Sequence, residues 1–151
     1  MTQQHDADQP YYRILCIDGG GIRGVFPAAF LARLQEHLPN PIASYFDLIA
    51  GTSTGGIIAL GLGFGMPPAR ILELYEENGP TIFGQRSGRI VNYLERLVRG
   101  TQNYFGTKHS AVDLENALRP ILQDLRLGDS KSRLLIPSWN AEAGRVYIYK
   151  T

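Results

Sequence analysis

The sequence predicts an α/β fold in which a mainly parallel sheet is flanked by helices. Short apolar runs end in glycine clusters, first at residues 13–17 and then at residues 46–50. After each cluster comes a segment whose apolar side chains recur at helical spacing. This repeated order of strand and helix is typical of α/β domains with parallel strands.

The remaining elements follow from turn residues and apolar spacing. The first helix, residues 25–38, has Val25, Phe26, Ala29, Phe30, Leu34 and Leu38 at helical spacing and precedes two prolines. A buried, glycine-rich helix is expected at residues 54–63, and Gly79-Pro80 is expected to end the helix that opens at Pro67-Pro68. The other expected elements are helices at residues 89–98 and 110–125 and strands at residues 133–137 and 145–150. In the 110–125 helix we expect Leu114, Leu118, Ile121, Leu122 and Leu125 to pack against other protein.

Composition excludes several function classes. With 151 residues the chain is long enough for one domain. The 15 Lys and Arg residues nearly balance the 14 Asp and Glu residues, so charge gives no case for nucleic-acid binding. The single cysteine, Cys16, is expected to be a small buried hydrophobe, and no Cys/His cluster has metal-ligand spacing. We expect no metal and no organic cofactor.

The amino-terminal residues give an expectation about location. Residues 1–11 form a polar lead that we expect to be disordered, and residues 12–151 form the domain. The lead lacks the features of a signal peptide, and the longest apolar run, residues 57–66, is too short to cross a bilayer. A cytoplasmic protein, with peripheral membrane contact left open, is the expectation.

A nucleophile elbow is predicted where the second strand meets the glycine-rich helix. The five residues there fit G-x-S-x-G: Gly51, Thr52, Ser53, Thr54 and Gly55. In this pattern a sharp, strained turn between strand and helix exposes the serine oxygen. The amides at the start of the helix favour negative charge at the same spot. A glycine-rich turn without chemistry is the alternative.

A second glycine cluster follows the first strand. Backbone amides left uncovered by consecutive glycines can donate to an oxyanion in acyl transfer. A dinucleotide site is the rival interpretation, because the loop also matches G-x-G-x-x-G; that fingerprint requires an acidic residue at the end of the second strand, where Ser53 stands instead. The loop comprises Asp18, Gly19, Gly20, Gly21, Ile22, Arg23 and Gly24.

Together the two motifs resemble those of the patatin-like phospholipases. Residues 18–24 resemble that family's oxyanion motif and residues 51–55 its nucleophile motif; residues 46–50, 105–107 and 149–151 resemble flanking landmarks. The resemblance implies a three-layer fold and a Ser–Asp dyad without histidine. In it Ser53 is the nucleophile, Gly20 and Gly21 supply oxyanion amides, and Arg23 holds the loop or meets a phosphate.

The family's aspartate belongs to a later D-G-[GA] motif, which this chain lacks after Gly55. We therefore expect the chain to be the amino-terminal part of a patatin-like domain, with the catalytic aspartate outside it. His5, His37, His109, Asp113, Asp124 and Asp129 are weaker candidates for the base. The predicted function is a serine hydrolase of lipid acyl esters; the alternative is a non-catalytic fragment that binds lipid or a partner.

Overall fold

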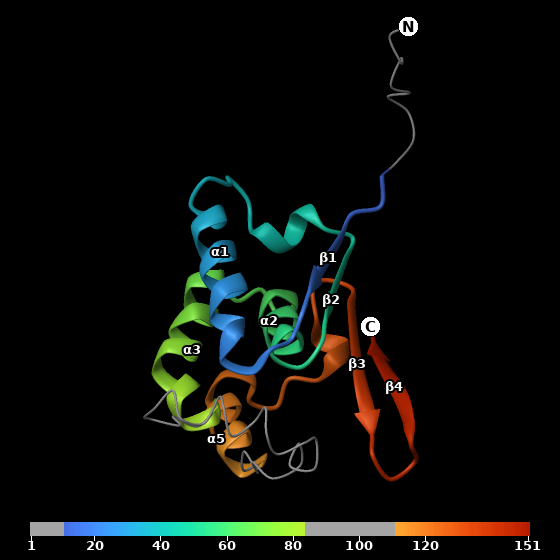
Figure 1. Ribbon diagram of the computed structural model, residues 1–151. Helices are drawn as coiled ribbons and strands as arrows, with labels where there is room; N and C mark the ends of the chain where they lie inside the picture. The colour runs from blue at the N-terminus through green and yellow to red at the C-terminus, as the bar shows by residue number, and fades with distance from the viewer. Residues whose placement is uncertain (1–10, 84–110) are drawn as a thin grey trace, which may run out of the picture.

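The computed structural model describes residues 11–83 and 111–151 (Figure 1). The expected helix at residues 89–98 and the landmark at residues 105–107 lie outside this part. The elements, in chain order, are β1 (Ile14–Ile17), η1 (Gly21–Gly24), α1 (Val25–Gln35), η2 (Ile42–Tyr45), β2 (Leu48–Gly51), α2 (Thr54–Gly63), α3 (Pro68–Phe83), α5 (Ala111–Leu122), η3 (Leu127–Asp129), β3 (Leu134–Asn140) and β4 (Arg145–Lys150).

The four strands form one sheet in the order β1-β2-β3-β4. β2 pairs parallel with β1 and with β3, while β4 returns antiparallel to β3 through a tight connection. Helices α1, α2 and α3 lie to one side of these strands (Figure 1). The predicted α/β class with a mainly parallel sheet is confirmed. Because β1 and β2 are parallel, the segments that follow them leave the sheet at the same end, the carboxyl end of both strands.

The core lies between the sheet and α2, the helix that was predicted residue for residue. Ile49 of β2 and Ile58 of α2 have no exposed surface, and Leu134 of β3 is 1% exposed. Two glycines let α2 approach its neighbours. A Cβ at Gly61 would lie 2.9 Å from Ile71 Cδ1, and one at Gly63 would lie 2.8 Å from Leu134 Cδ1. The central helix is therefore held close to both the sheet and α3.

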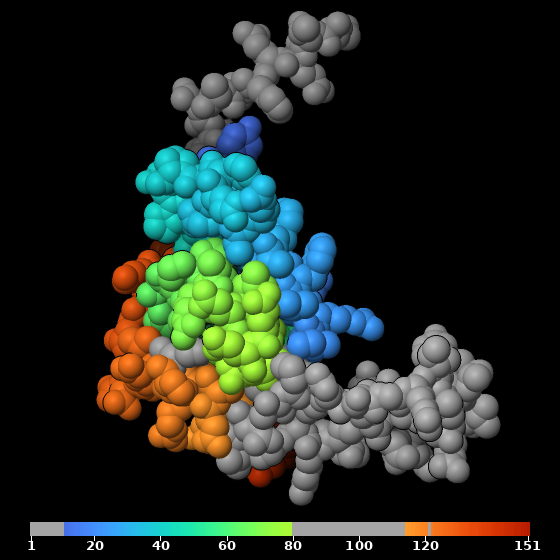
Figure 2. All heavy atoms as spheres, turned by 90° about the vertical axis from the view of Figure 1, so that its left-hand side faces the viewer, coloured from blue at the N-terminus to red at the C-terminus, as the bar shows by residue number. Residues whose placement is uncertain are grey.

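Helix α3 contacts α1 and α5 on the face seen in Figure 2. It continues through Gly79-Pro80 to Phe83, so the prediction that this pair ends the helix is wrong. Gly79 has a packing role instead, because a Cβ there would lie 2.6 Å from Ile22 Cδ1 of η1. Pro80 lacks an N–H and so removes one i→i−4 hydrogen bond from the helix, which runs only three residues beyond it.

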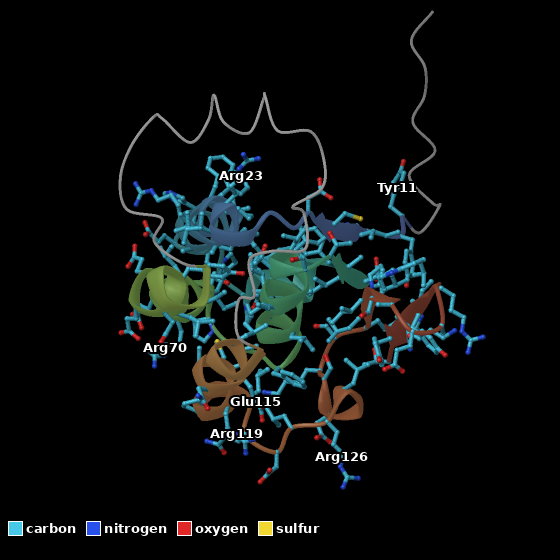
Figure 3. The ribbon with its side chains drawn as sticks, turned by 60° about the horizontal axis from the view of Figure 1, so that its bottom comes forward. Tyr11, Arg23, Arg70, Glu115, Arg119 and Arg126 are labelled. Carbon is cyan, nitrogen blue, oxygen red and sulfur yellow. The ribbon has the colours of Figure 1, made fainter. Side chains whose placement is uncertain are left out.

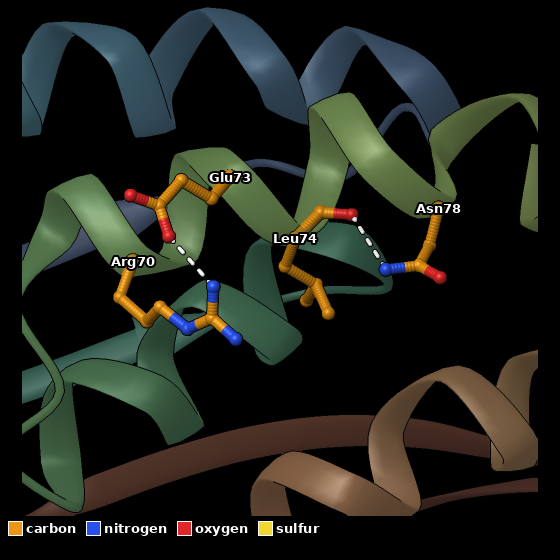
Figure 4. A network of polar contacts seen from close by, with 4 residues as sticks. All are labelled: Arg70, Glu73, Leu74 and Asn78. Carbon is orange, nitrogen blue, oxygen red and sulfur yellow. Dashed lines mark hydrogen bonds and ion pairs between the residues drawn. The ribbon is translucent and has the colours of Figure 1, made fainter.

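The outer side of α3 carries polar contacts that do not reach the sheet (Figure 4). Arg70 Nη1 donates to Glu73 Oε2 at 2.7 Å, and both side chains are more than half exposed. Asn78 Nδ2 donates to the Leu74 carbonyl at 3.4 Å. An exposed pair of this kind contributes little to stability. Helix α3 is held by its apolar side, where Ile71 and Tyr75 are buried.

Helix α1 turns a different face to the core than its apolar spacing suggested. Its buried residues are Ala28 and Leu31. Phe26 and Phe30, by contrast, are 76% and 59% exposed, and Leu34 is also exposed. The helix packs mainly on α3 rather than on the sheet. Its aromatic stripe therefore stands beside β1 and is not covered by the described residues.

Cys16 is exposed, so the prediction that it is buried is wrong. The strand prediction itself is correct, but among the described residues β1 lies at the edge of the sheet. Cys16 and Ile14 lie on the same face of it, and Ile14 is 50% exposed. An apolar run is typical of a strand that is buried on both faces, whereas one face of β1 is left exposed here.

The end of the described chain is partly buried. Leu114, Leu118 and Leu122 of α5 are half-buried and the helix contacts α3, as expected, although Leu125 lies beyond the helix and is 47% exposed. All six residues of β4 are exposed. Within residues 11–83 and 111–151, no helix has the length and apolarity needed to cross a bilayer.

Candidate active site

Ser53 occupies a strained turn between β2 and α2. Its φ of 52° and ψ of −122° lie outside the regions that side-chain-bearing residues favour. Such a conformation costs about 1–3 kcal/mol and persists only where its surroundings enforce it. Ser53 precedes α2, yet its hydroxyl does not cap the helix and the residue is exposed. Ser53 is thus exposed at the start of α2.

Two glycines make the turn sterically possible. A Cβ at Gly51 would lie 2.2 Å from the Gly55 carbonyl oxygen, and one at Gly55 would lie 2.1 Å from the Ile17 carbonyl oxygen. No side chain fits at these distances. The turn is closed by two backbone bonds, from the Thr52 N–H to Ile17 at 3.2 Å and from the Gly55 N–H to Thr52 at 2.9 Å.

The glycine loop after β1 packs directly on this turn. The Gly19 N–H donates to Thr52 Oγ1 and the Gly20 N–H donates to Thr54 Oγ1, both at 3.1 Å. A Cβ at Gly19 would lie 2.7 Å from Ser53 Cβ. The two segments singled out in the sequence, 34 residues apart, are therefore in contact. The threonines on either side of Ser53 hold the loop, a role that the sequence analysis did not assign to them.

These hydrogen bonds determine which backbone N–H groups near Ser53 remain without an acceptor. The Gly20 N–H is engaged by Thr54, so it is not open to a dinucleotide or to a substrate oxygen in this arrangement. The first N–H groups of a helix have no acceptor within the helix. In the first turn of η1 the N–H groups of Gly21 and Ile22 therefore have no acceptor within the helix. The same holds for the Thr54 N–H at the start of α2. The start of α2 also carries a partial positive charge.

Tyr75 of α3 contacts both motifs from the interior of the protein. Its hydroxyl donates to the Thr54 carbonyl at 2.8 Å, and the residue is only 2% exposed. Its ring lies against Gly24, where a Cβ would meet it at 2.8 Å. Burial raises the pKa of Tyr75 well above its ordinary value. The sequence placed Tyr75 on a helix but gave no sign of this contact, since it joins elements distant in the chain.

The rest of the loop forms the turn η1. Gly21 has a φ of 60°, which glycine adopts without strain. The Arg23 N–H donates to the Gly20 carbonyl at 3.2 Å, while its side chain is exposed and points outward (Figure 3). Ile22 reaches to Gly79 of α3. Arg23 is therefore exposed on the outer side of the loop (Figure 3).

The candidate bases that the structure describes are not gathered at the serine. His37 and Asp124 are exposed surface residues, and Asp129 Oδ2 accepts from the Arg126 N–H at 2.7 Å. His5 and His109 lie outside the described residues, and the side chain of Asp113 lies outside the described side chains. No hydrogen bond to the Ser53 hydroxyl is present among residues 11–83 and 111–151. The same part of the chain holds no group of three or more His, Cys, Asp or Glu suited to a metal ion.

Comparison with known proteins identifies the family. The model of the patatin-like phospholipases matches residues 15–150, nearly the whole chain. The chain belongs to the patatin-like phospholipase family. The contacting pair of motifs described above thus occurs in a patatin-like domain, as the sequence analysis expected.

Three relatives illustrate the range of this family. The chain is 42% identical over 142 residues to a cGAMP-activated phospholipase of Pseudomonas aeruginosa, an alignment that covers 94% of this chain and 40% of the relative. It is 35% identical to patatin-like protein 1 of Oryza sativa, covering 91% of this chain and 35% of the relative. It is 30% identical to phospholipase A I of Arabidopsis thaliana, covering 92% of this chain and 11% of the relative. The chain therefore spans two fifths or less of each relative's length.

The contact between loop and turn can be tested with a glycine pair. Gly19→Ala places a methyl group 2.5 Å from the Thr52 carbonyl oxygen, so the loop must move away from Ser53. Gly128→Ala is the control, because a Cβ there meets nothing within 4 Å. We expect Gly19→Ala to lower the free energy of unfolding by about 1–3 kcal/mol in urea titrations, as overpacking does. Equal stability of the two variants would contradict the contact.

Tyr75 gives a pH-dependent signature. Its pKa is higher in the folded chain than the ordinary value of 10.0. The stability that depends on its proton is thus complete below pH 10 and is lost as the pH rises, by about 1.4 kcal/mol per unit. We expect the unfolding free energy of Tyr75→Phe to fall less steeply above pH 10 than that of the wild type. Tyr149→Phe, at an exposed tyrosine, should keep the wild-type slope. Identical slopes in all three proteins would show that Tyr75 ionises freely.

Proposed function

We propose that Ser53 is the nucleophile of a serine acyl hydrolase that cleaves acyl esters of lipids. The observation that carries the proposal is the strained conformation of Ser53, held against the glycine loop at the start of α2. Strain of this kind gathers at functional sites. The family is shown to be that of patatin-like phospholipases, and a lipid ester is the substrate class that this family name supports.

In the proposed reaction the Ser53 oxygen attacks the ester carbonyl carbon, and its proton passes to a carboxylate. The tetrahedral oxyanion accepts hydrogen bonds from the amides of the glycine loop and of Thr54 at the start of α2. Because the Gly20 N–H is engaged by Thr54 Oγ1, Gly21 is the loop residue that we assign to this role first. Gly20 would join only if it released Thr54. Expulsion of the alcohol takes the proton back, and water then hydrolyses the acyl-enzyme.

The carboxylate is the aspartate of a D-G-[GA] motif, which we place outside this chain. Support comes from the sequence, which has no such motif after Gly55, and from the relatives, which are much longer than the matched segment. The alternative function is that of a non-catalytic module that binds lipid or a partner. It is favoured by one observation, that the Ser53 hydroxyl has no hydrogen-bond partner among the described residues.

A chimera separates the two functions. This chain replaces the matching 142-residue segment of the Pseudomonas aeruginosa relative, whose remainder is kept. We expect the chimera to hydrolyse a short p-nitrophenyl ester about 10²–10⁴-fold faster than the isolated chain, which is the usual contribution of positioned proton transfer. Ser53→Ala should abolish that turnover. Ser44→Ala, an exposed serine whose hydroxyl donates to Pro41, should not change it.

Two outcomes would contradict the proposal. A folded chimera that binds phospholipid vesicles but turns over neither the ester nor the lipid would establish the binding module. An isolated chain as fast as the chimera would mean that a residue within it is the base, and His109 is the first to substitute.

A further inference from the structure

One face of α3 lies against the turn η1 of the glycine loop. Tyr75 and Gly79 are four residues apart in α3, so they lie on the same face of the helix. The Tyr75 ring fills the space that a side chain would take at Gly24, the last residue of η1. Ile22, in the middle of η1, fills the corresponding space at Gly79. Helix α3 therefore supports the middle and the end of the turn.

The beginning of η1 is connected to the same tyrosine through Thr54. The Tyr75 hydroxyl donates to the Thr54 carbonyl at 2.8 Å, and Thr54 Oγ1 accepts from the Gly20 N–H at 3.1 Å. Tyr75 and Thr54 are each 2% exposed, and a hydrogen bond shielded from water is electrostatically stronger than one in water. Burial also raises the pKa of Tyr75, so the hydroxyl keeps the proton that it donates. One side chain thus reaches both Gly20 and Gly24, which lie at the two ends of the turn.

The turn itself has little rigidity. It is a 3-10 helix of four residues that follows two further glycines, and Gly21 has a φ of 60°. The hydrogen bonds of a 3-10 turn have poorer geometry than those of an α-helix, and glycine restricts the backbone less than any other residue. Donors stabilise an oxyanion only at a close and fixed distance, and a displacement of about 1 Å can cost about 10²-fold in rate. The position of the loop must therefore be set by its neighbours.

We infer that Tyr75 is a positioning residue for acyl transfer: it holds the glycine loop at both ends, so that the N–H groups of the turn stay in place beside Ser53. It acts through Thr54 and Gly24 and not on the reacting atoms. The inference rests on the proposed function, since acyl transfer at Ser53 is the reaction that the loop serves. The hydroxyl separates positioning from packing, because phenylalanine would fill the same space without holding Thr54.

Removal of the hydroxyl is the first test. In the chimera described above, we expect Tyr75→Phe to lower kcat for the p-nitrophenyl ester at least about tenfold. KM should stay the same, because the oxyanion donors stabilise the transition state rather than the bound substrate. An unchanged kcat, with or without a rise in KM, would overturn the inference.

Ile71→Val is the matched control. Ile71 is buried in the same helix one turn before Tyr75, and its side chain packs on α2 at Gly61. Loss of a buried methyl group and loss of a buried hydrogen bond lower stability by similar amounts, so a purely structural role of Tyr75 would give both variants the same kcat. We expect Ile71→Val to keep the wild-type kcat and KM. Equal losses in the two variants would assign the effect to general stability and overturn the inference.

A pair of glycine variants tests the contact with the ring and keeps the hydroxyl. Gly24→Ala places a methyl group 2.8 Å from Tyr75 Cε1, and Gly61→Ala places one 2.9 Å from Ile71 Cδ1 of the same helix. Both overpack α3, but only the first also displaces the loop. We expect Gly24→Ala to lower kcat at least about tenfold and Gly61→Ala to leave it unchanged. Equal kcat in these two variants would overturn the inference, also where Tyr75→Phe does not fold.

Hydrogen exchange separates this inference from the proposed function. The N–H groups of Gly20 and Arg23 are hydrogen-bonded, so peptides spanning residues 19–24 report how firmly the loop is held. In the chimera, Tyr75→Phe should speed exchange in these peptides at least about tenfold, and Ile71→Val should not. If this result is obtained in a chimera without esterase activity, the proposed function fails while the hold of Tyr75 on the loop is supported. Equal exchange in the two variants would overturn the inference whether or not the chimera is active.

Discussion

The contact between two backbones, that of the loop after β1 and that of the turn after β2, is the constraint on which the site depends. Side chains are absent at Gly19, Gly51 and Gly55, where a Cβ would meet backbone oxygens at 2.1–2.5 Å. The two segments can approach in this way because neighbouring parallel strands have their carboxyl ends at the same end of the sheet. Moving either segment by the width of a methyl group would separate the glycine loop from Ser53.

The same contact explains why the strain at Ser53 persists. Hydrogen bonds from Gly19 and Gly20 to the flanking threonines fix the turn from one side, and Tyr75 fixes the Thr54 carbonyl from the other. Each is modest, since a typical net contribution is about 0.5–1.5 kcal/mol. Together they are of the size needed to offset an unfavourable φ/ψ pair. The serine is thereby held at the start of α2 without its hydroxyl being used as a cap.

The local features were predictable from the sequence, and the orientation of elements was not. Helix α2 and the nearness of the two motifs follow from short segments, because each glycine cluster comes directly after a predicted parallel strand. The buried face of α1 was not predictable, because the spacing of Phe26 and Phe30 indicates an apolar stripe but not which element packs on it. Gly79 likewise reads as a helix end until Ile22, more than fifty residues away, is seen to occupy the space where its Cβ would be. Tyr75 was missed for the same reason.

The central claim is that Ser53 is a reactive nucleophile by virtue of its position. Reaction of the chimera with a fluorophosphonate, followed by peptide mass spectrometry, tests it most directly because the reagent marks activated serines irrespective of substrate. We expect a single adduct, on Ser53, and none after Ser53→Ala. An adduct on another serine, or a folded chimera that acquires none, would contradict the claim.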